Sequence, residues 1–157
     1  MQSYYVDGVT MQPLLDVNES VMVNKTAYLF HAPERGDVIV FHFPLDTSRN
    51  YIKRVIGLPG DTIVMDNTHV SVNGVQLVEP YVKNPYNPQG ATFVVPADQY
   101  FVMGDNRQYN DDSRSWGAVP RSYIIGKAVM VFWPILHMRF LNTYPDVFKN
   151  IKSPRSK

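Results

Sequence analysis

The chain has 157 residues, of which 45% are hydrophobic and 18% are charged, so it indicates one folded globular domain and excludes wholesale disorder. Its 15 basic and 14 acidic residues leave a net charge of +1, which gives no basic excess for a nucleic-acid-binding surface. The absence of cysteine excludes disulfides, thiol catalysis and cysteine-ligated zinc, and the four histidines lack metal-site spacing, so we expect no metal or cofactor.

Short runs of β-branched and aromatic residues recur along the chain, separated by Gly, Pro, Asn and Asp. In chain order they predict strands at Ser20–Asn24, Asp37–Phe43, Tyr51–Ile56, Thr62–Met65, Val70–Val72, Val75–Val78, Thr92–Val95, Tyr100–Met103 and Ile124–Trp133. The pair Asn73-Gly74 predicts a two-residue hairpin turn with positive φ at both positions. Pro59-Gly60 predicts a second turn.

The segments between and after these runs are poor in helical periodicity. Residues 79–90 carry three prolines and predict an extended surface loop, and residues 139–149 predict a helical turn or two interrupted by Pro145. The basic tail, residues 151–157, is expected to be disordered. The longest apolar-rich run, residues 128–136, is too short to span a bilayer. Nine short strands predict a mostly β domain over residues 1–150, sandwich-like or barrel-like.

Lys53 lies in a predicted strand whose other members include Ile52, Val55 and Ile56. A lysine buried among apolar groups loses hydration of its charged form, so its pKa falls. A neutral amine can take a proton from a hydroxyl, and a hydroxyl–lysine pair can therefore hydrolyse an acyl bond without histidine. The alternative is an outward-facing lysine paired with a carboxylate.

A polar run rich in Gly, Asp, Asn and Arg, residues 104–117, follows an apolar strand. Such runs form turns with side chain to backbone hydrogen bonds and arginine–carboxylate pairs. We interpret Asp112 and Arg114 as support for a neighbouring site rather than as reacting groups.

Three ordered segments of the chain together resemble the type I signal peptidases, the membrane-bound serine–lysine proteases that remove signal peptides. The family's first box, Ser-Met-x-Pro-Thr-Leu, corresponds to residues 10–15, Thr-Met-Gln-Pro-Leu-Leu. Its lysine box, Lys-Arg-x-x-Gly-x-Pro-Gly-Asp, is matched throughout by residues 53–61. Its last box, Gly-Asp-Asn-Arg-x-x-Ser-x-Asp-Ser-Arg-x-x-Gly, is matched by residues 104–117 except at Asn110. The resemblance runs from about Tyr4 to Trp133.

The resemblance implies a core of bent antiparallel β-sheets, in which residues 66–96 form a small hairpin-and-loop insertion. It implies that Lys53 is the general base, that residue 10 is the nucleophile, and that the Thr10 backbone N–H binds the oxyanion, helped in the family by a group at the position of Gly8. Supporting positions would be Arg54, Asp105, Asn110, Asp112 and Arg114. Shallow substrate pockets would be lined by Tyr4, Val6, Met11, Leu15, Val40, Tyr51 and Ile52, although such side chains are equally typical of plain core.

Three positions depart from the family pattern. Thr10 replaces serine, and its extra methyl group restricts χ1 and crowds a site built for serine. Asn110 replaces a serine that helps to orient the lysine amine, and Leu14 replaces a threonine. Family members also carry a transmembrane segment before the first box, so we expect a single-pass membrane protein with this domain on the extracytoplasmic face and an anchor absent from this chain.

The altered positions leave two main interpretations open. One is an active signal peptidase that cleaves exported preproteins after Ala-x-Ala through Thr10 and Lys53, or a serine enzyme whose nucleophile was replaced by engineering. The other, which the two changes around one lysine favour slightly, is a signal-peptidase-like protein that assists sortase-dependent pilus assembly in Gram-positive bacteria and binds pilin or sortase without efficient proteolysis. A third and weaker interpretation is a β domain that has lost binding function.

Overall fold

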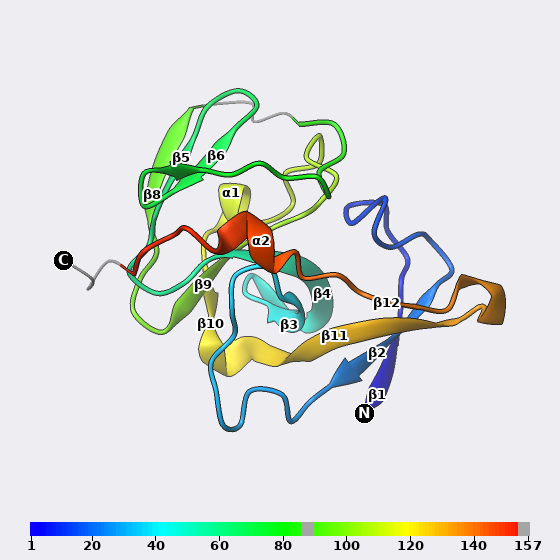
Figure 1. Ribbon diagram of the computed structural model, residues 1–157. Coiled ribbons are helices and arrows are strands. Elements are labelled where there is room, and N and C mark those ends of the chain that lie inside the picture. The colour runs from blue at the N-terminus through cyan, green and yellow to red at the C-terminus, as the bar shows by residue number, and fades with distance from the viewer. Residues whose placement is uncertain (86–89, 154–157) are drawn as a thin grey trace.

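The computed structural model describes residues 1–85 and 90–153, and within them twelve strands form two antiparallel sheets (Figure 1). The larger sheet contains β1 (Gln2–Tyr5), β2 (Ser20–Asn24), β3 (Val38–Phe43), β4 (Asp46–Gly57), β9 (Gln99–Met103), β10 (Val119–Pro120), β11 (Ile124–Trp133) and β12 (Arg139–Phe140). The smaller sheet contains β5 (Thr62–Met65), β6 (Val70–Val72), β7 (Val75–Gln76) and β8 (Ala91–Val94). The predicted mostly β architecture is therefore confirmed.

The larger sheet has the strand order β1-β2-β11-β3-β4-β9-β10, with β12 paired to β11. The register shifts within the β11–β2, β11–β3, β3–β4 and β4–β9 pairs, and such irregularities bend a sheet. The smaller sheet, in the order β7-β6-β5-β8, lies between β4 and β9 in sequence and at one end of the molecule in Figure 1. Single helical turns complete the fold: α1 (Ser113–Trp116), η1 (Arg121–Tyr123), η2 (Ile135–His137) and α2 (Pro145–Phe148).

The hydrophobic pattern of β3 explains how the larger sheet buries both faces. Val38 and Val40 enter one core cluster, whereas Ile39 and Phe41 enter another, as the two-residue period of a strand requires. A third cluster fills the space between the smaller sheet and the neighbouring strand β9. The larger sheet therefore presents β3 and β4 as a rigid platform, packed on both sides.

Both predicted turns are present. Asn73 and Gly74 have φ of 50° and 83° and connect β6 to β7, so the hairpin prediction is confirmed. At the second turn the Asp61 backbone N–H donates to the Leu58 carbonyl at 3.0 Å, and Gly60 supplies the positive φ of 85° that this turn needs.

The segments expected to be irregular are more ordered than predicted. Tyr81 is buried in the core, and Lys83 exchanges backbone hydrogen bonds of 2.8 Å with Asp105 and Arg107, so the first part of the 79–90 loop is held against the polar run. The helical turn begins at Pro145 rather than being interrupted by it, because proline fits the first turn of a helix. Ile151 packs against the core, contrary to the expected disorder, while residues 86–89 and 154–157 of these two predictions lie outside the described residues. No helix in the described ranges has the length and hydropathy needed to cross a membrane.

Candidate active site

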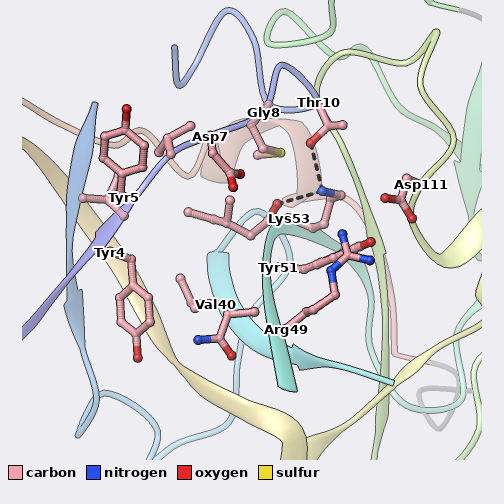
Figure 2. A pocket seen from close by; sticks show the side chains of 15 residues that line it. Tyr4, Tyr5, Asp7, Gly8, Thr10, Val40, Arg49, Tyr51, Lys53 and Asp111 are labelled. Carbon is pink, nitrogen blue, oxygen red and sulfur yellow. Dashed lines mark hydrogen bonds between the residues drawn. The ribbon is translucent and has the colours of Figure 1, made fainter. Parts of the chain in front are cut away.

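The side chains of Thr10 and Lys53 meet although 43 residues separate them in sequence (Figure 2). Lys53 Nζ donates to Thr10 Oγ1 at 2.9 Å and to the Ile52 carbonyl at 3.1 Å. Thr10 lies in the turns that follow β1, and Lys53 lies on β4, the long strand that pairs with both β3 and β9. A rigid strand therefore carries the amine, and a loop brings the hydroxyl to it.

The polar run after β9 holds the Thr10 loop in place. The Asn106 backbone N–H donates to the Thr10 carbonyl at 3.0 Å, and Asn106 Nδ2 donates to the Val9 carbonyl at 3.0 Å. Gly104 lies so close that a Cβ there would come within 2.7 Å of the Thr10 carbonyl oxygen. Glycine at position 104 is thus required by the close approach of the two segments rather than by a special φ.

Lys53 is 4% exposed, so the alternative of an outward-facing lysine is wrong. Burial lowers the pKa of Lys53 from 10.5 to about 8, against the opposing effect of the nearby Asp112, Asp111 and Asp105 carboxylates. The ring of Tyr51, two residues away on the same strand, has its centroid 5.1 Å from Nζ. An appreciable fraction of neutral amine is therefore present in mildly alkaline solution, in contact with a hydroxyl.

Thr10 and Lys53 open into a groove of about 420 Å³ between the β1 segment and the β3–β4 hairpin. Six of the seven predicted pocket residues line it, namely Tyr4, Val6, Met11, Val40, Tyr51 and Ile52. Leu15 does not, because it is fully buried in the core cluster that also contains Val21 and Val131. Gly8 lines the groove, and a Cβ at this position would meet nothing within 4 Å. The Thr10 backbone N–H donates to no backbone carbonyl of the described residues.

Asp112, Arg114, Arg54 and Asp105 form the expected supporting network. Asp112 accepts from the Gly104 N–H at 2.9 Å and pairs with Arg114 at 2.8 Å. Arg54 forms a two-bond pair with Asp105, at 3.0 and 2.9 Å, with both side chains completely buried. These bonds connect the strand that carries Lys53 to the run that holds Thr10.

Asn110 does not join this network through its side chain. It is exposed, and the hydrogen bonds described for it are accepted by its backbone carbonyl, from the Asp112 N–H and the Ser115 hydroxyl. Asn110 is the position at which a contact that orients the lysine amine was expected to be lost, and no hydrogen bond between its side chain and Lys53 is described.

Several groove residues were missed by the sequence interpretation. Arg49 and Asn50 precede Tyr51 on β4, Asp7 follows β1, and Asp111 adjoins Asp112. The Arg49 guanidinium lies 5.3 Å from the Tyr51 ring centroid. The place of Asp111 inside the polar run could have indicated a groove residue. Nothing in the sequence around Arg49 indicates that its side chain lines a groove.

The buried carboxylate of Glu19 holds the residues that follow Thr10 in the turns after β1. Glu19 is 1% exposed and accepts from the Asp16 N–H at 2.7 Å and from Arg139 at 2.7 and 2.8 Å. Arg139 also donates to the Leu14 carbonyl at 2.7 Å, and His137 lies 3.0 Å from Glu19. Burial opposes ionisation of Glu19, but these hydrogen bonds outweigh it and lower its pKa from 4.5 to about 2.

We expect Glu19→Gln to lower the free energy of unfolding at pH 7 by about 1–3 kcal/mol, because Arg139 loses its charged acceptor. The stabilisation by ionised Glu19 is complete above pH 4.5 and is lost as the pH falls towards 2, so wild type and variant should converge in acid. Urea unfolding at pH 7 and pH 3 measures this, with Glu34→Gln as the exposed control. Equal destabilisation at both pH values would contradict the role of the Glu19 charge.

Comparisons with known proteins give consistent matches. A protein-family model described as "Signal peptidase, peptidase S26" matches residues 1–133. A signal peptidase I of Leptolyngbya laminosa is 41% identical over 153 residues, covering 92% of this chain and 75% of that protein. The signal peptidase I P of Bacillus subtilis subsp. natto is 40% identical over 151 residues, covering 88% of this chain and 80% of that protein. A solved signal peptidase I from Enterococcus faecalis V583 has a TM-score of 0.54 at 35% identity, over 61% of this chain and 96% of that one.

Proposed function

The chain belongs to the peptidase S26 family of signal peptidases, and we propose that it hydrolyses the bond between a signal peptide and an exported preprotein, with Thr10 as nucleophile and Lys53 as general base. The observation that carries this proposal is the 2.9 Å hydrogen bond between a buried lysine amine and a hydroxyl at the wall of an open groove. Burying the Lys53 amine costs hydration free energy, and a functional role for the amine explains why this cost is retained.

In the first step the neutral Lys53 amine takes the proton from Thr10 Oγ1 as this oxygen attacks the carbonyl carbon of the scissile bond. The carbonyl electron pair moves to its oxygen, and the Thr10 backbone N–H, with no backbone acceptor of its own in the described chain, is the candidate donor to this oxyanion. Gly8 adds no side-chain donor, so oxyanion binding depends more heavily on the backbone.

In the second step the tetrahedral intermediate collapses, the carbon–nitrogen bond breaks, and the Lys53 ammonium returns its proton to the leaving amine. The acyl group is then held as an ester on Thr10. Lys53 is neutral again, so it can take a proton from water as the water attacks the ester. When the second tetrahedral intermediate collapses, the bond between the acyl carbon and Thr10 Oγ1 breaks, Lys53 returns this proton to Thr10 Oγ1, and the signal peptide leaves with a new carboxyl group. The cycle needs one titrating side chain, and this agrees with the single buried amine at the site.

The groove supports an extended peptide with small side chains near the bond. Val40, Ile52 and Met11 give it apolar walls, and the Tyr51 ring centroid lies 5.1 Å from Lys53 Nζ. Shallow apolar surface of this kind accepts alanine and excludes large residues, which fits cleavage after Ala-x-Ala. We further propose that the protein acts at the extracytoplasmic face of the cell membrane, where its substrates emerge.

A role in pilus assembly is the second candidate, and the position of Asn110 is what favours it. The serine expected at residue 110 is replaced by an exposed asparagine whose side chain is not described bonding to Lys53, and the Thr10 methyl group restricts the nucleophile. In this alternative the groove binds a pilin segment or a sortase without efficient cleavage. The close contact between Thr10 and Lys53 favours the hydrolytic proposal over it.

The decisive experiment compares wild type, Thr10→Ser and Thr10→Val on a peptide that contains an Ala-x-Ala signal sequence. We expect cleavage by wild type, about 10- to 100-fold faster cleavage by Thr10→Ser because the crowding methyl is gone, and none above background by the isosteric Thr10→Val. Mass spectrometry of the products locates the cut. If neither wild type nor Thr10→Ser cleaves the peptide, the hydrolytic proposal fails and the result favours the role in pilus assembly.

A further inference from the structure

Asp111 places a fixed carboxylate in the same groove as Thr10 and Lys53 (Figure 2). Trp116 Nε1 donates to Asp111 Oδ1 at 3.0 Å. The Tyr51 ring lies beside Trp116, and burial together with the nearby Asp111 carboxylate raises the pKa of Tyr51. The Trp116 ring packs edge-on against the stacked rings of Phe43 and Tyr51. The Asp111 carboxylate is therefore held on the groove side by an aromatic cluster, although the residue is exposed.

The amine of Lys53 needs such a partner once it takes up a proton. An ammonium has three N–H groups, and the two described acceptors are Thr10 Oγ1 and the Ile52 carbonyl. When Thr10 Oγ1 bonds to the substrate carbon it becomes an ether-like oxygen and then an ester oxygen, which are weaker acceptors, so its contact with the new ammonium weakens. Asn110 is exposed and is not among the described hydrogen-bond partners of Lys53, so it offers no replacement.

Asp111 differs from the other carboxylates that act on Lys53. Asp112 is paired with Arg114 and Asp105 with Arg54, so the charge of each is largely compensated by its own arginine. Asp111 has no lysine, arginine or histidine nitrogen within ion-pair distance in the described parts of the chain. Arg49 also lines the groove and lies over the Tyr51 ring, but no ion pair between Arg49 and Asp111 is described, so the Asp111 carboxylate still acts on the groove as a negative charge.

We propose that Asp111 is a positioning residue for Lys53, and that its carboxylate, held by Trp116, stabilises the ammonium formed when Thr10 gives up its proton. This inference rests on the proposed function, because it assigns Asp111 a part in the same proton transfer. No covalent bond to Asp111 forms or breaks.

Removal of the Asp111 charge should shift the pKa of Lys53 in one direction. The groups that act on the amine are Asp112, Asp111 and Asp105, which raise the pKa of Lys53, and Arg114, which lowers it, against the dominant lowering by burial. Removing the Asp111 charge should lower the pKa of Lys53 further, so the neutral form appears at lower pH. It should also make Lys53 a weaker base, so the rate plateau in alkali should fall.

The test uses Asp111→Asn, in which the amide oxygen can still accept from Trp116, with Asp111→Glu as the rescue and Asp146→Asn as a control outside the groove. Lys53 is titrated by NMR through its labelled Cε, and kcat and KM are each measured from pH 6 to pH 10.5 on the signal-sequence peptide. We expect the Lys53 midpoint to fall by about 0.5 pH unit in Asp111→Asn, to return in Asp111→Glu and to stay at the wild-type value in Asp146→Asn. The kcat plateau should fall about threefold to tenfold in Asp111→Asn.

An unchanged Lys53 midpoint in a folded Asp111→Asn protein overturns the inference. The same holds for a change confined to KM, which would make Asp111 a substrate contact instead. The titration does not depend on turnover, so a shifted midpoint without any cleavage by wild type would contradict the proposed function while upholding the effect of Asp111 on Lys53.

Discussion

Lys53→Met should reduce kcat/KM for a signal-sequence peptide by on the order of 10²–10⁴ while leaving the protein folded. Methionine matches the length of the lysine stem and fills the same buried space, but it cannot take the proton from Thr10. The hydroxyl then lacks a base, because no other titratable group is described within hydrogen-bond distance of Thr10 Oγ1.

The same substitution should stabilise the protein at pH 7. Below pH 8 the folded protein must bury the charged form of the Lys53 amine, which lowers its stability. Between about pH 8 and 10.5 the amine is neutral in the folded protein but still protonated in the unfolded chain. The free energy of unfolding of the wild type therefore rises with pH across that interval. Lys53→Met removes this dependence, and we expect it to raise the free energy of unfolding at pH 7 by on the order of 1–3 kcal/mol. Opposite effects on activity and stability distinguish a functional lysine from a structural one.

Urea unfolding and peptide cleavage, both measured from pH 6 to pH 10.5, check the two expectations together. Wild-type kcat/KM should rise through about pH 8 as Lys53 loses its proton. Lys25→Met, which removes an exposed lysine on the turn after β2, serves as the matched control. Near-normal cleavage by Lys53→Met would rule out Lys53 as the base. A lower free energy of unfolding for Lys53→Met than for wild type at pH 7 would show that burying the charged amine does not destabilise the protein.

Much of the sheet structure could be predicted, because local chemistry determines it. The strands at Ser20–Asn24, Thr62–Met65, Val70–Val72 and Ile124–Trp133 begin and end where the β-branched runs do. Strand β1 was missed because its residues 2–5 are mostly exposed and lack alternation, and it is a strand only because β2 supplies a pairing edge. The two-residue strands β10 and β12 likewise depend on tertiary pairing rather than on their own sequence.

The site was predictable only in part, because its geometry depends on contacts distant in sequence. The pairing of Thr10 with Lys53 was expected from the resemblance to signal peptidases, since a lysine on a strand gives no sign of which hydroxyl it meets. Leu15 was misplaced because an apolar residue near a site looks the same whether it lines the groove or supports it from below. The groove side chains of Arg49 and Asp111 depend on the aromatic cluster around Tyr51, which no local pattern reveals.

Removal of the Asp105 side chain should strongly destabilise this protein. Arg54 and Asp105 are both fully buried, and the same guanidinium donates to the Gly36 and Asn142 carbonyls at 2.8 and 2.9 Å. Burial raises the pKa of Asp105, and the Arg54 charge opposes that effect. Asp105→Ala would leave a buried guanidinium without its counter-charge, and we expect it to lower the free energy of unfolding by about 3–5 kcal/mol. The exposed Asp146→Ala is the control.

The pair also links the two halves of the site, because Arg54 follows Lys53 and Asp105 lies between Gly104 and Asn106. The double variant Arg54→Met with Asp105→Leu keeps the core filled and leaves no charge unpaired, so it should be markedly more stable than Asp105→Ala. Cleavage should nevertheless stay impaired in this double variant, because the Thr10 loop is no longer tied to the strand that carries Lys53. Urea unfolding and cleavage of the three proteins separate these effects. If the double variant is no more stable than Asp105→Ala, the unpaired Arg54 charge is not the cause of the destabilisation. If the double variant is fully active, Thr10 reaches Lys53 without the Arg54–Asp105 link.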